Sequence, residues 1–262
     1  MQPLSVTLIQ SDIHWEDIEL NLSMFGKKID SIHEKTQVIV LPEMFSTGFT
    51  MKPEGLAETM DGRTVQWMKA MSKEKNAVIT GSIIIKEDNH FFNRLIWMLP
   101  TGNFGYYDKR HLFSFAGEDV PYRSGDKKLI GSLSGWKINL QVCYDLRFPV
   151  WSRQDTDPEK QYDLYINVAN WPDKRSDAWR TLLGARAIEN QCYVVGVNRV
   201  GTDGNGHHYD GFSSVIDPLG KVLWTKENQE AVYTHTFQEE EIAEVRSHFP
   251  FLNDADNYNL LL

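Results

Sequence analysis

A glutamate, a lysine and a cysteine each follow a short apolar run of this sequence. VIVLPEMF places Glu43 after one run, FGYYDKRHLF places Lys109 after an aromatic-rich one, and INLQVCYDLRFP places Cys143 between an apolar run and a charged turn. In α/β sheets, catalytic groups gather just beyond the carboxyl ends of strands. These three residues are therefore the first candidates for chemistry.

Each candidate taken alone has an ordinary explanation. A glutamate after a strand is usually a solvated turn residue, and a lysine followed by Arg110 and His111 usually lies on the surface. A lone cysteine is often a small buried hydrophobe, which is the interpretation we give to Cys192 in CYVVGV. No single residue predicts a function.

Together the three residues supply what a thiol nucleophile needs. A thiol is a weak nucleophile until a base removes its proton, and a carboxylate in an apolar pocket is a competent base. An ammonium group stabilises the thiolate and the developing oxyanion, and the backbone N–H of Tyr144 is a second oxyanion donor. A Cys–His hydrolase using His111 or His14 is an alternative, and mutating those histidines distinguishes it.

The elements that position these residues are strands alternating with helices. Apolar spacing of three and four residues predicts helices at 17–34, 64–75 and 177–191. Runs rich in Val and Ile predict strands at 4–10, 38–41, 77–85, 136–144, 162–169, 192–200 and 231–237. The stretch 77–109 resembles consecutive strands with turns at EDNH and PTGN. This pattern predicts a layered α/β fold with mixed rather than purely parallel sheets.

Composition narrows the function classes. The formal net charge of −9, with no cluster of Lys and Arg, argues against nucleic acid or an anionic membrane surface as a partner. The N-terminal MQPLSVTLIQ lacks the features of a signal peptide, and no apolar run is long enough to span a membrane. Two cysteines form no disulfide framework or zinc spacing, and the histidines are not arranged as ligands. We expect a cytoplasmic protein without metal or cofactor.

Three of these segments carry a family resemblance. LPEMFSTGF, DKRHLF and VCYDLRFP resemble the signatures of the nitrilase, or carbon–nitrogen hydrolase, superfamily. The resemblance continues through NVANWP, ARAIENQCYVVGVNRVG, YDGFSSVIDPLG and the final FPFLNDADNY, in collinear order over nearly the whole chain. It implies one domain over 1–262 with the four-layer α-β-β-α sandwich of the family. It also implies at least a homodimer, with the C-terminal tail at about 238–262 at the subunit interface.

The resemblance also assigns roles by position. Glu43 would be the general base, Lys109 the oxyanion stabiliser and Cys143 the nucleophile of an amidase that forms a thioester. Glu118, nine positions past the lysine, would lie near the substrate, and Trp171 would form a pocket wall. Asp145 and Arg147 are expected to pair around the nucleophile turn. A catalytically dead scaffold is a distant alternative, since all three triad residues are present.

The residues of the motifs LPEMFSTGF, NVANWP and FPFLNDAD are most similar to those of the omega-amidase branch. That branch hydrolyses the terminal amide of 2-oxo dicarboxylic monoamides such as 2-oxoglutaramate. Deaminated glutathione, another small aliphatic amide or a nitrile are alternative substrates. A substrate carboxylate needs cationic or N–H-rich surroundings, and Arg147, Lys174 and Arg175 are candidates for that contact.

Overall fold

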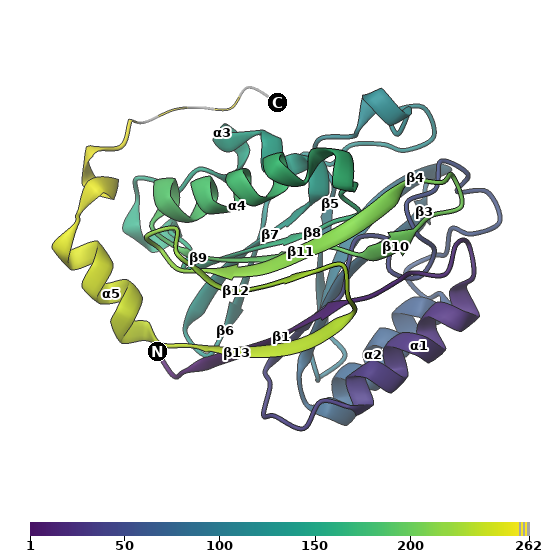
Figure 1. The fold of residues 1–262 in the computed structure, drawn as a ribbon, viewed down its shortest axis with the longest axis horizontal. Helices are drawn as coiled ribbons and strands as arrows, with labels where there is room; N and C mark the ends of the chain where they lie inside the picture. The colour runs from purple at the N-terminus through teal and green to yellow at the C-terminus, as the bar shows by residue number, and fades with distance from the viewer. Residues whose placement is uncertain (257, 259, 261–262) are drawn as a thin grey trace.

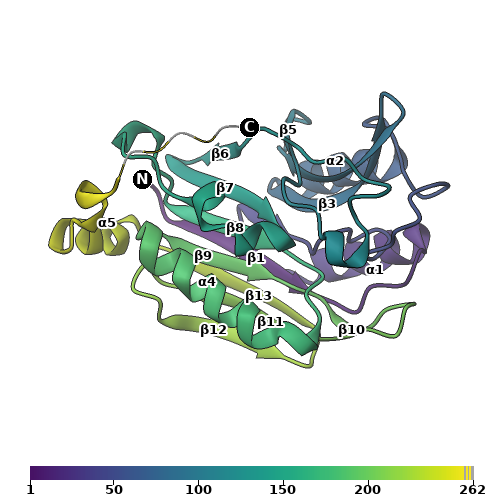
Figure 2. The same cartoon turned by 90° about the horizontal axis from the view of Figure 1, so that it is seen from above.

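Two β-sheets packed face to face, with helices on their outer sides, build the molecule (Figure 1). The computed structural model describes residues 1–256, 258 and 260 of the chain. Helices α1 and α2 lie on one side of the sandwich and α4 lies on the other (Figures 1 and 2). The four-layer α-β-β-α arrangement expected from the sequence is therefore confirmed.

The first sheet is mixed. Within the described residues it has six strands, in the spatial order β13 (Ala231–Phe237), β1 (Leu4–Gln10), β2 (Val38–Val40), β3 (Val78–Glu87), β4 (His90–Met98) and β5 (Phe104–Asp108). Strands β1, β2 and β3 are parallel, and the remaining pairs are antiparallel. The consecutive strands and turns predicted for 77–109 are the β3–β4–β5 meander.

The second sheet is mixed as well. Its strands, seven in the described part of the chain, are β10 (Val200–Thr202), β11 (His208–Ile216), β9 (Tyr193–Val197), β8 (Leu164–Val168), β7 (Trp136–Val142) and β6 (Leu129–Leu133), with β12 (Val222–Glu227) paired to β11. Strands β7, β8 and β9 are parallel, so their carboxyl ends lie at one edge. All residues of β8 and β9 are buried, as central strands of a layered fold must be.

The helices bury one apolar face each. Asp17 caps α1 (Ile18–Asp30) by accepting a hydrogen bond from the N–H of Leu20. Helix α2 (Arg63–Lys75) packs beside α1, and α4 (Ser176–Asn190) covers the second sheet. Gly196 of β9 permits the close approach of α4, because a Cβ there would clash with Trp179 and Leu183.

Helix α1 ends four residues earlier than the apolar spacing predicts. Its last turn closes at Ser31, whose N–H donates to the carbonyls of Lys27 and Ile29. The chain then has to reach β2. Just before that strand, the N–H of Gln37 donates to the carbonyl of Ser5, and the side-chain Oε1 of Gln37 accepts from the N–H of Ser5. Ile32 still packs against the apolar cluster under α1, which is why it fits the helical spacing.

Two apolar clusters support the layers. One fills the space between the sheets and under α4, and includes Leu8, Trp136, Leu140, Val195 and Phe237. The other lies between the first sheet and helices α1 and α2. Cys192 is fully buried within the first cluster, as its apolar surroundings in the sequence predicted.

Short helices fill the remaining connections. They are η1 (Ser114–Ala116), η2 (Cys143–Arg147), α3 (Pro149–Ser152), η3 (Pro158–Lys160) and η4 (Asp173–Arg175). Helix α5 (Glu239–His248) and η5 (Phe251–Asp254) follow β13 and lie beside one end of the sandwich (Figure 2). Of the predicted interface tail at 238–262, residues 257, 259 and 261–262 lie outside the described residues.

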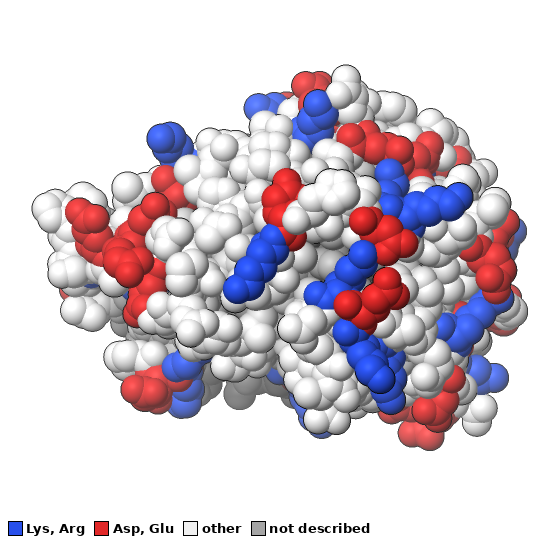
Figure 3. Space-filling view, turned by 90° about the horizontal axis from the view of Figure 1, so that it is seen from below, with Lys and Arg blue, Asp and Glu red and all other residues white. Residues whose placement is uncertain are grey.

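Charge is mixed over the surface that Figure 3 shows. Lys and Arg lie beside Asp and Glu on the right of that view, and a group of acidic residues lies at its left end. In residues 1–256, 258 and 260, every helix falls short of the length and apolar character needed to cross a bilayer.

Candidate active site

Four loops meet where the carboxyl ends of strands from both sheets come together. Glu43 follows β2 and Lys109 follows β5 in the first sheet, while Cys143 follows β7 and Asn170 follows β8 in the second. The structure therefore brings the three residues singled out in the sequence to one place. The face-to-face packing of the sheets is what joins them.

Lys109 lies between two carboxylates. Its Nζ donates to Glu43 Oε1 at 2.9 Å and to Glu118 at 2.8 Å (Oε2) and 3.0 Å (Oε1). All three side chains are fully buried. Burial of charges is favourable only when they are paired and hydrogen-bonded, and this arrangement satisfies the ammonium completely. Glu118 thus contacts Lys109 in the buried site, and its expected position near the substrate stays a prediction.

Asn93 of β4 joins the two carboxylates from a third side. Its Nδ2 donates to Glu43 Oε1 at 2.8 Å and to Glu118 Oε1 at 3.2 Å. The carbonyl of Asn93 also accepts from the N–H of Lys109 at 3.0 Å. The sequence analysis missed this residue, although an Asn within the apolar strand HFFNRLIW was a visible signal.

The nucleophile turn holds Cys143 in an unusual conformation. Cys143 begins η2 with φ of 45°, in the left-handed region that residues with a Cβ rarely adopt. Its Sγ lies 3.9 Å from the carbonyl oxygen of Asn170. A backbone strained in this way occurs mainly where the surrounding structure enforces it, often at functional sites.

Asn170 fixes the Glu43 carboxylate beside the thiol. The N–H of Asn170 donates to Glu43 Oε2 at 2.8 Å, and its Nδ2 donates to the Glu43 carbonyl at 2.5 Å. The Glu43 carboxylate is close enough to raise the pKa of the Cys143 thiol. A carboxylate held beside the thiol can act as its general base.

Charges and burial set the protonation of the site. Burial raises the pKa of the Cys143 thiol well above its usual value, and Glu43 raises it further, against the opposing effect of Lys109. Burial alone would lower the pKa of Lys109, but Glu118, Glu43 and the Cys143 sulfur outweigh it and raise the pKa. Burial also raises the pKa of Glu118. The resting site therefore holds a neutral thiol and a charged lysine.

Asp145 connects the nucleophile turn to neighbouring segments through hydrogen bonds to its carboxylate. Its carboxylate accepts from Tyr107 Oη at 2.7 Å, from the N–H of Val142 at 3.1 Å and from the N–H of His111 at 2.9 Å, and it lies 2.8 Å from His111 Nδ1. The expected pairing of Asp145 with Arg147 is therefore wrong. Arg147 instead lies over the Trp171 ring, 4.9 Å from its centroid.

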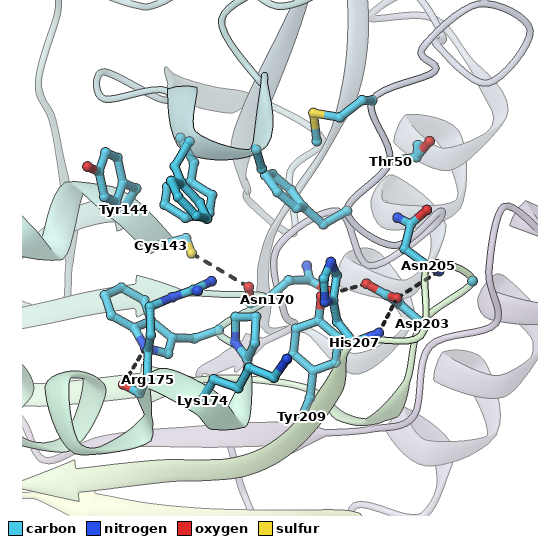
Figure 4. Close-up of a pocket in the computed structure, with 18 of the residues that line it drawn as sticks. Thr50, Cys143, Tyr144, Asn170, Lys174, Arg175, Asp203, Asn205, His207 and Tyr209 are labelled. Carbon is cyan, nitrogen blue, oxygen red and sulfur yellow. Dashed lines mark hydrogen bonds between the residues drawn. The ribbon is translucent and has the colours of Figure 1, made fainter.

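A cleft of about 790 Å³ opens above Cys143 (Figure 4). Tyr144 and Trp171 line it, as do aromatic rings from other loops, including Trp15, Phe49, Phe113 and Tyr209. Trp171 is buried, and its Nε1 donates to the carbonyl of Arg175 at 2.8 Å. The cleft is therefore lined largely by aromatic rings, with Cys143 and Asn170 among its polar residues, which suits a small organic substrate.

The charged residues of the cleft are mainly cationic. Lys52, Arg147, Lys174 and Arg175 line it, against the acids Glu16 and Asp203. The Asp203 carboxylate already accepts three hydrogen bonds, from the N–H groups of Asn205 and His207 and from Tyr209 Oη. Glu16 accepts from Thr50 Oγ1. The remaining charge favours an anionic ligand.

Other arrangements for chemistry are less well supported. The His111 ring stacks on Phe148 at 3.7 Å between centroids, and its Nδ1 faces Asp145, so it is committed to that pair. Within the described part of the chain, no three His, Cys, Asp or Glu side chains are grouped to hold a metal ion.

A model of the carbon–nitrogen hydrolase family matches residues 5–247. The chain belongs to this family. It is 43% identical to an omega-amidase of Escherichia coli K12, YafV, over 99% of this chain and all of that protein. It is 31% identical to a 2-oxoglutaramate amidase of Bacillus subtilis, over 95% and 96% of the two chains.

Solved structures agree with this assignment. A CN-hydrolase superfamily protein of Xanthomonas campestris, solved with an arsenic adduct in its active site, is 44% identical. It superposes with a TM-score of 0.97 over 99% of this chain and all of that one. The chain is thus a carbon–nitrogen hydrolase of the nitrilase superfamily, in its omega-amidase branch, and acts on non-peptide amides.

In this hydrolase, the sequence analysis identified the buried charged residues but missed the amides that orient them. Asn93 and Asn170 both donate to Glu43, from β4 and from the loop after β8. The segment 203–209, which closes one side of the cleft, was also missed. Its Asp, Asn, Gly and His residues are typical of an ordinary turn and gave no signal of a site.

Proposed function

We propose that this hydrolase cleaves the terminal amide of a small 2-oxo dicarboxylic acid monoamide, of the 2-oxoglutaramate type, releasing ammonia. The observation that carries the proposal is the cationic lining of the cleft above Cys143. The chain as a whole has a net charge of −9, so this local excess of positive charge is specific to the site. The names of the relatives support the same substrate class.

The first half-reaction forms a thioester. Glu43 takes the proton of the Cys143 thiol as Sγ attacks the amide carbonyl carbon. The ammonium of Lys109 and the backbone N–H of Tyr144 stabilise the oxyanion. Glu43 then passes the proton to the amide nitrogen, the C–N bond breaks, and ammonia leaves.

The second half-reaction returns the enzyme to its starting state. Glu43 accepts a proton from water, which attacks the thioester carbonyl. The C–S bond breaks, the carboxylic acid forms and the thiolate recovers its proton from Glu43. The hydrogen bonds from Asn93 and Asn170 hold the carboxylate in place through both steps. Glu118 keeps Lys109 charged and oriented.

Cations in the cleft explain why an anionic amide is the better substrate. Burying a substrate carboxylate without a partner costs several kcal/mol, whereas a guanidinium supplies paired N–H donors for it. A neutral amide of the same length lacks this contact. We therefore expect it to lose about 2–3 kcal/mol of transition-state binding.

Ammonia release from a small panel of amides tests the proposal. The panel contains 2-oxoglutaramate, glutamine, asparagine, butyramide and a nitrile of matching length. We expect 2-oxoglutaramate to exceed butyramide by about 30- to 150-fold in kcat/KM, the range that corresponds to one charge-assisted contact. Equal efficiency on butyramide, or faster consumption of the nitrile, would contradict the substrate and leave the triad intact.

We also propose that residues 1–262 act as one hydrolase domain and assemble at least into a homodimer. Exposed apolar residues beside α4 support an interface there. Ile188 of α4 lies next to the turn of Leu219 and Gly220, and Gln191 bonds the carbonyl of Phe249 after α5. Ile188, Leu219 and Phe251 are each more than half exposed. Solvent-exposed residues of this kind, gathered from three segments, are typical of contact surfaces.

A further inference from the structure

Among the cations of the cleft, Arg175 stands apart because of how its backbone is held. Arg175 ends η4, and its carbonyl accepts the Nε1–H of Trp171 at 2.8 Å. Trp171 is in turn fixed by its own N–H, which donates to Asn198 Oδ1 at 2.8 Å. The guanidinium is thus attached to a rigid part of the cleft wall.

The guanidinium itself is positioned by an aromatic ring of the site. Its Cζ lies 5.1 Å from the centroid of the Phe113 ring, within the range of a cation–π contact. The N–H of Phe113 donates to Glu118 Oε2 at 2.6 Å, and Glu118 binds Lys109. One chain of contacts therefore connects Arg175 to the charged centre.

Arg175 is half-buried and has no ion-pair partner in the described part of the chain, whereas the three fully buried arginines are all paired. Arg94, Arg186 and Arg199 each bind a carboxylate. Figure 4 shows the Arg175 side chain extending into the cleft on the side of Cys143, whereas Lys174 extends toward Tyr209. Its donors remain available to a ligand that reaches the nucleophile.

We propose that Arg175 binds the 2-oxo acid end of the substrate and is the residue that selects anionic 2-oxo amides. This inference rests on the function proposed above. A guanidinium presents parallel N–H donors in a plane. A planar 2-oxo carboxylate offers matching acceptors, either two carboxylate oxygens or one of them and the 2-oxo oxygen.

The same contact rejects amino acids. Glutamine has the amide and the carboxylate of 2-oxoglutaramate, but an ammonium group replaces the 2-oxo oxygen. The substrate ammonium and the Arg175 guanidinium would repel each other. The loss of the 2-oxo acceptor would also leave an N–H of the guanidinium unpaired. Arg175 therefore explains discrimination between two substrates that differ only at the carbon next to the carboxylate.

Arg147 is the second candidate for this role. Its guanidinium also lies over an aromatic ring, 4.9 Å from the Trp171 centroid, and is four residues after the nucleophile, so the Arg147→Ala variant decides between the two arginines. Lys174 is exposed, and an ammonium lacks the planar fork. These residues contribute positive potential to the cleft, and Arg175 makes the specific contact.

Substitution of Arg175 tests the inference with three substrates. Ammonia release is measured on 2-oxoglutaramate, glutamine and butyramide for Arg175→Ala, Arg175→Lys and Arg147→Ala. Arg180→Ala, on the exposed side of α4 outside the cleft, is the matched control. We expect Arg175→Ala to lower kcat/KM on 2-oxoglutaramate by about 30- to 150-fold, mainly through KM, and on butyramide by far less. The ratio of 2-oxoglutaramate to glutamine activity should fall in Arg175→Ala. The kcat/KM of Arg175→Lys on 2-oxoglutaramate should lie between those of the parent and Arg175→Ala, and that of Arg180→Ala should stay close to the parent.

Two results would overturn the inference. One is an equal loss on butyramide and 2-oxoglutaramate in Arg175→Ala with an unchanged melting temperature, and the other is a selective loss confined to Arg147→Ala. Succinamate, an anionic monoamide without the 2-oxo group, separates this inference from the proposed function. If the parent enzyme cleaves succinamate but not 2-oxoglutaramate, the proposed substrate is wrong, and a selective loss on succinamate in Arg175→Ala still identifies the carboxylate contact. If the parent cleaves neither, both proposals fail.

Discussion

The buried charges around Cys143 determine how the thiol is activated. Glu43 and Glu118 are both in contact with Lys109, so the three groups together have a net charge of −1 when all are ionised. A thiolate formed by loss of a proton to solvent would add a second negative charge in a buried site. Transfer of that proton to Glu43 leaves the total unchanged. The site therefore favours a neutral thiol that loses its proton only as it attacks the substrate.

A titration of the thiol tests this view. The raised pKa of Cys143 favours the protonated form, so its thiolate should be absent at the pH of about 8.5 where an ordinary cysteine ionises. Ultraviolet thiolate absorbance is measured for Cys192→Ala and for the double variant that also has Cys143→Ala. We expect no difference step near that pH, and a step there or lower would show a preformed thiolate.

The two cysteines provide a matched pair for the nucleophile assignment. Cys143→Ala should abolish ammonia release with little change in fold, because the side chain makes one weak contact with the Asn170 carbonyl. Cys192→Ala should retain most activity, since Cys192 lies in the apolar core away from the cleft. Mass spectrometry after iodoacetamide treatment identifies the modified residue, and inactivation through Cys192 alone would exclude Cys143.

Glu43→Gln isolates the role of the base. Gln preserves the size of the side chain and one acceptor but takes no proton. We expect a loss of about 100- to 10,000-fold in both thioester formation and thioester hydrolysis, because one carboxylate serves both steps. Rapid-quench measurement of the thioester separates the two rates. A loss confined to one of them would require a second base.

At the scale of elements, the nucleophile turn depends on a buried network that crosses between the sheets. Tyr107 of β5 donates to Asp145 of η2, and Trp151 of α3 donates to Tyr107 Oη at 2.9 Å. Asp145 also accepts from the backbone just before the nucleophile. This network holds Cys143 at its positive φ, so β5 and α3 act on the reaction through the geometry of the turn.

Removing the hydroxyl of Tyr107 tests that role. Tyr107→Phe leaves Trp151 Nε1 and the N–H of Arg110 without their partner, which should cost about 1–3 kcal/mol of unfolding free energy. The misplaced thiol should lower kcat by about tenfold or more while KM changes little. Tyr162→Phe is the control, because it removes a buried hydrogen bond to Ser152 away from this turn. An equal loss of kcat in both variants would assign the effect to stability alone.

The sequence predicted the central strands, helices α1, α2 and α4 and the charged residues for the same physical reason, but it did not predict β6, β11, β12 or α5. A strand such as 38–41 is a continuous apolar run, and a Glu, Lys or Cys at the end of an apolar run is unusual enough to be noticed. The supporting contacts gave no such signal. Sequence proximity favours a pairing of Asp145 with Arg147, two residues later. The actual partner Tyr107 lies 38 residues earlier, and local sequence does not indicate that contact. Contacts between the two sheets depend on packing, which local spacing does not specify.

At the scale of the whole molecule, exposed apolar residues lie near the C-terminal end of α4. Ile188 is 57% exposed, and Leu219, Val222 and Phe251 nearby in the fold are also exposed. Helix α4 runs along the second sheet with α5 beyond its end (Figure 2). The same helix begins just after Arg175 and packs under the cleft wall through Trp179, which lies 5.5 Å from Trp171. Contacts between two copies at α4 would therefore also stabilise the wall that carries the substrate-binding arginine.

A charge placed on that surface tests the proposed homodimer. Ile188→Glu should shift the molar mass measured by light scattering after gel filtration toward the monomer, because a carboxylate buried between two copies has no partner. Leu20→Glu, at a position 51% exposed on α1 across the sandwich, is the matched control and should leave the mass unchanged. If α4 contacts stabilise the cleft wall, Ile188→Glu should also raise KM for 2-oxoglutaramate, and the parent enzyme should show the same increase on dilution below its dissociation constant. A monomeric parent, or a mass that changes with Leu20→Glu instead, would place the interface elsewhere or remove it.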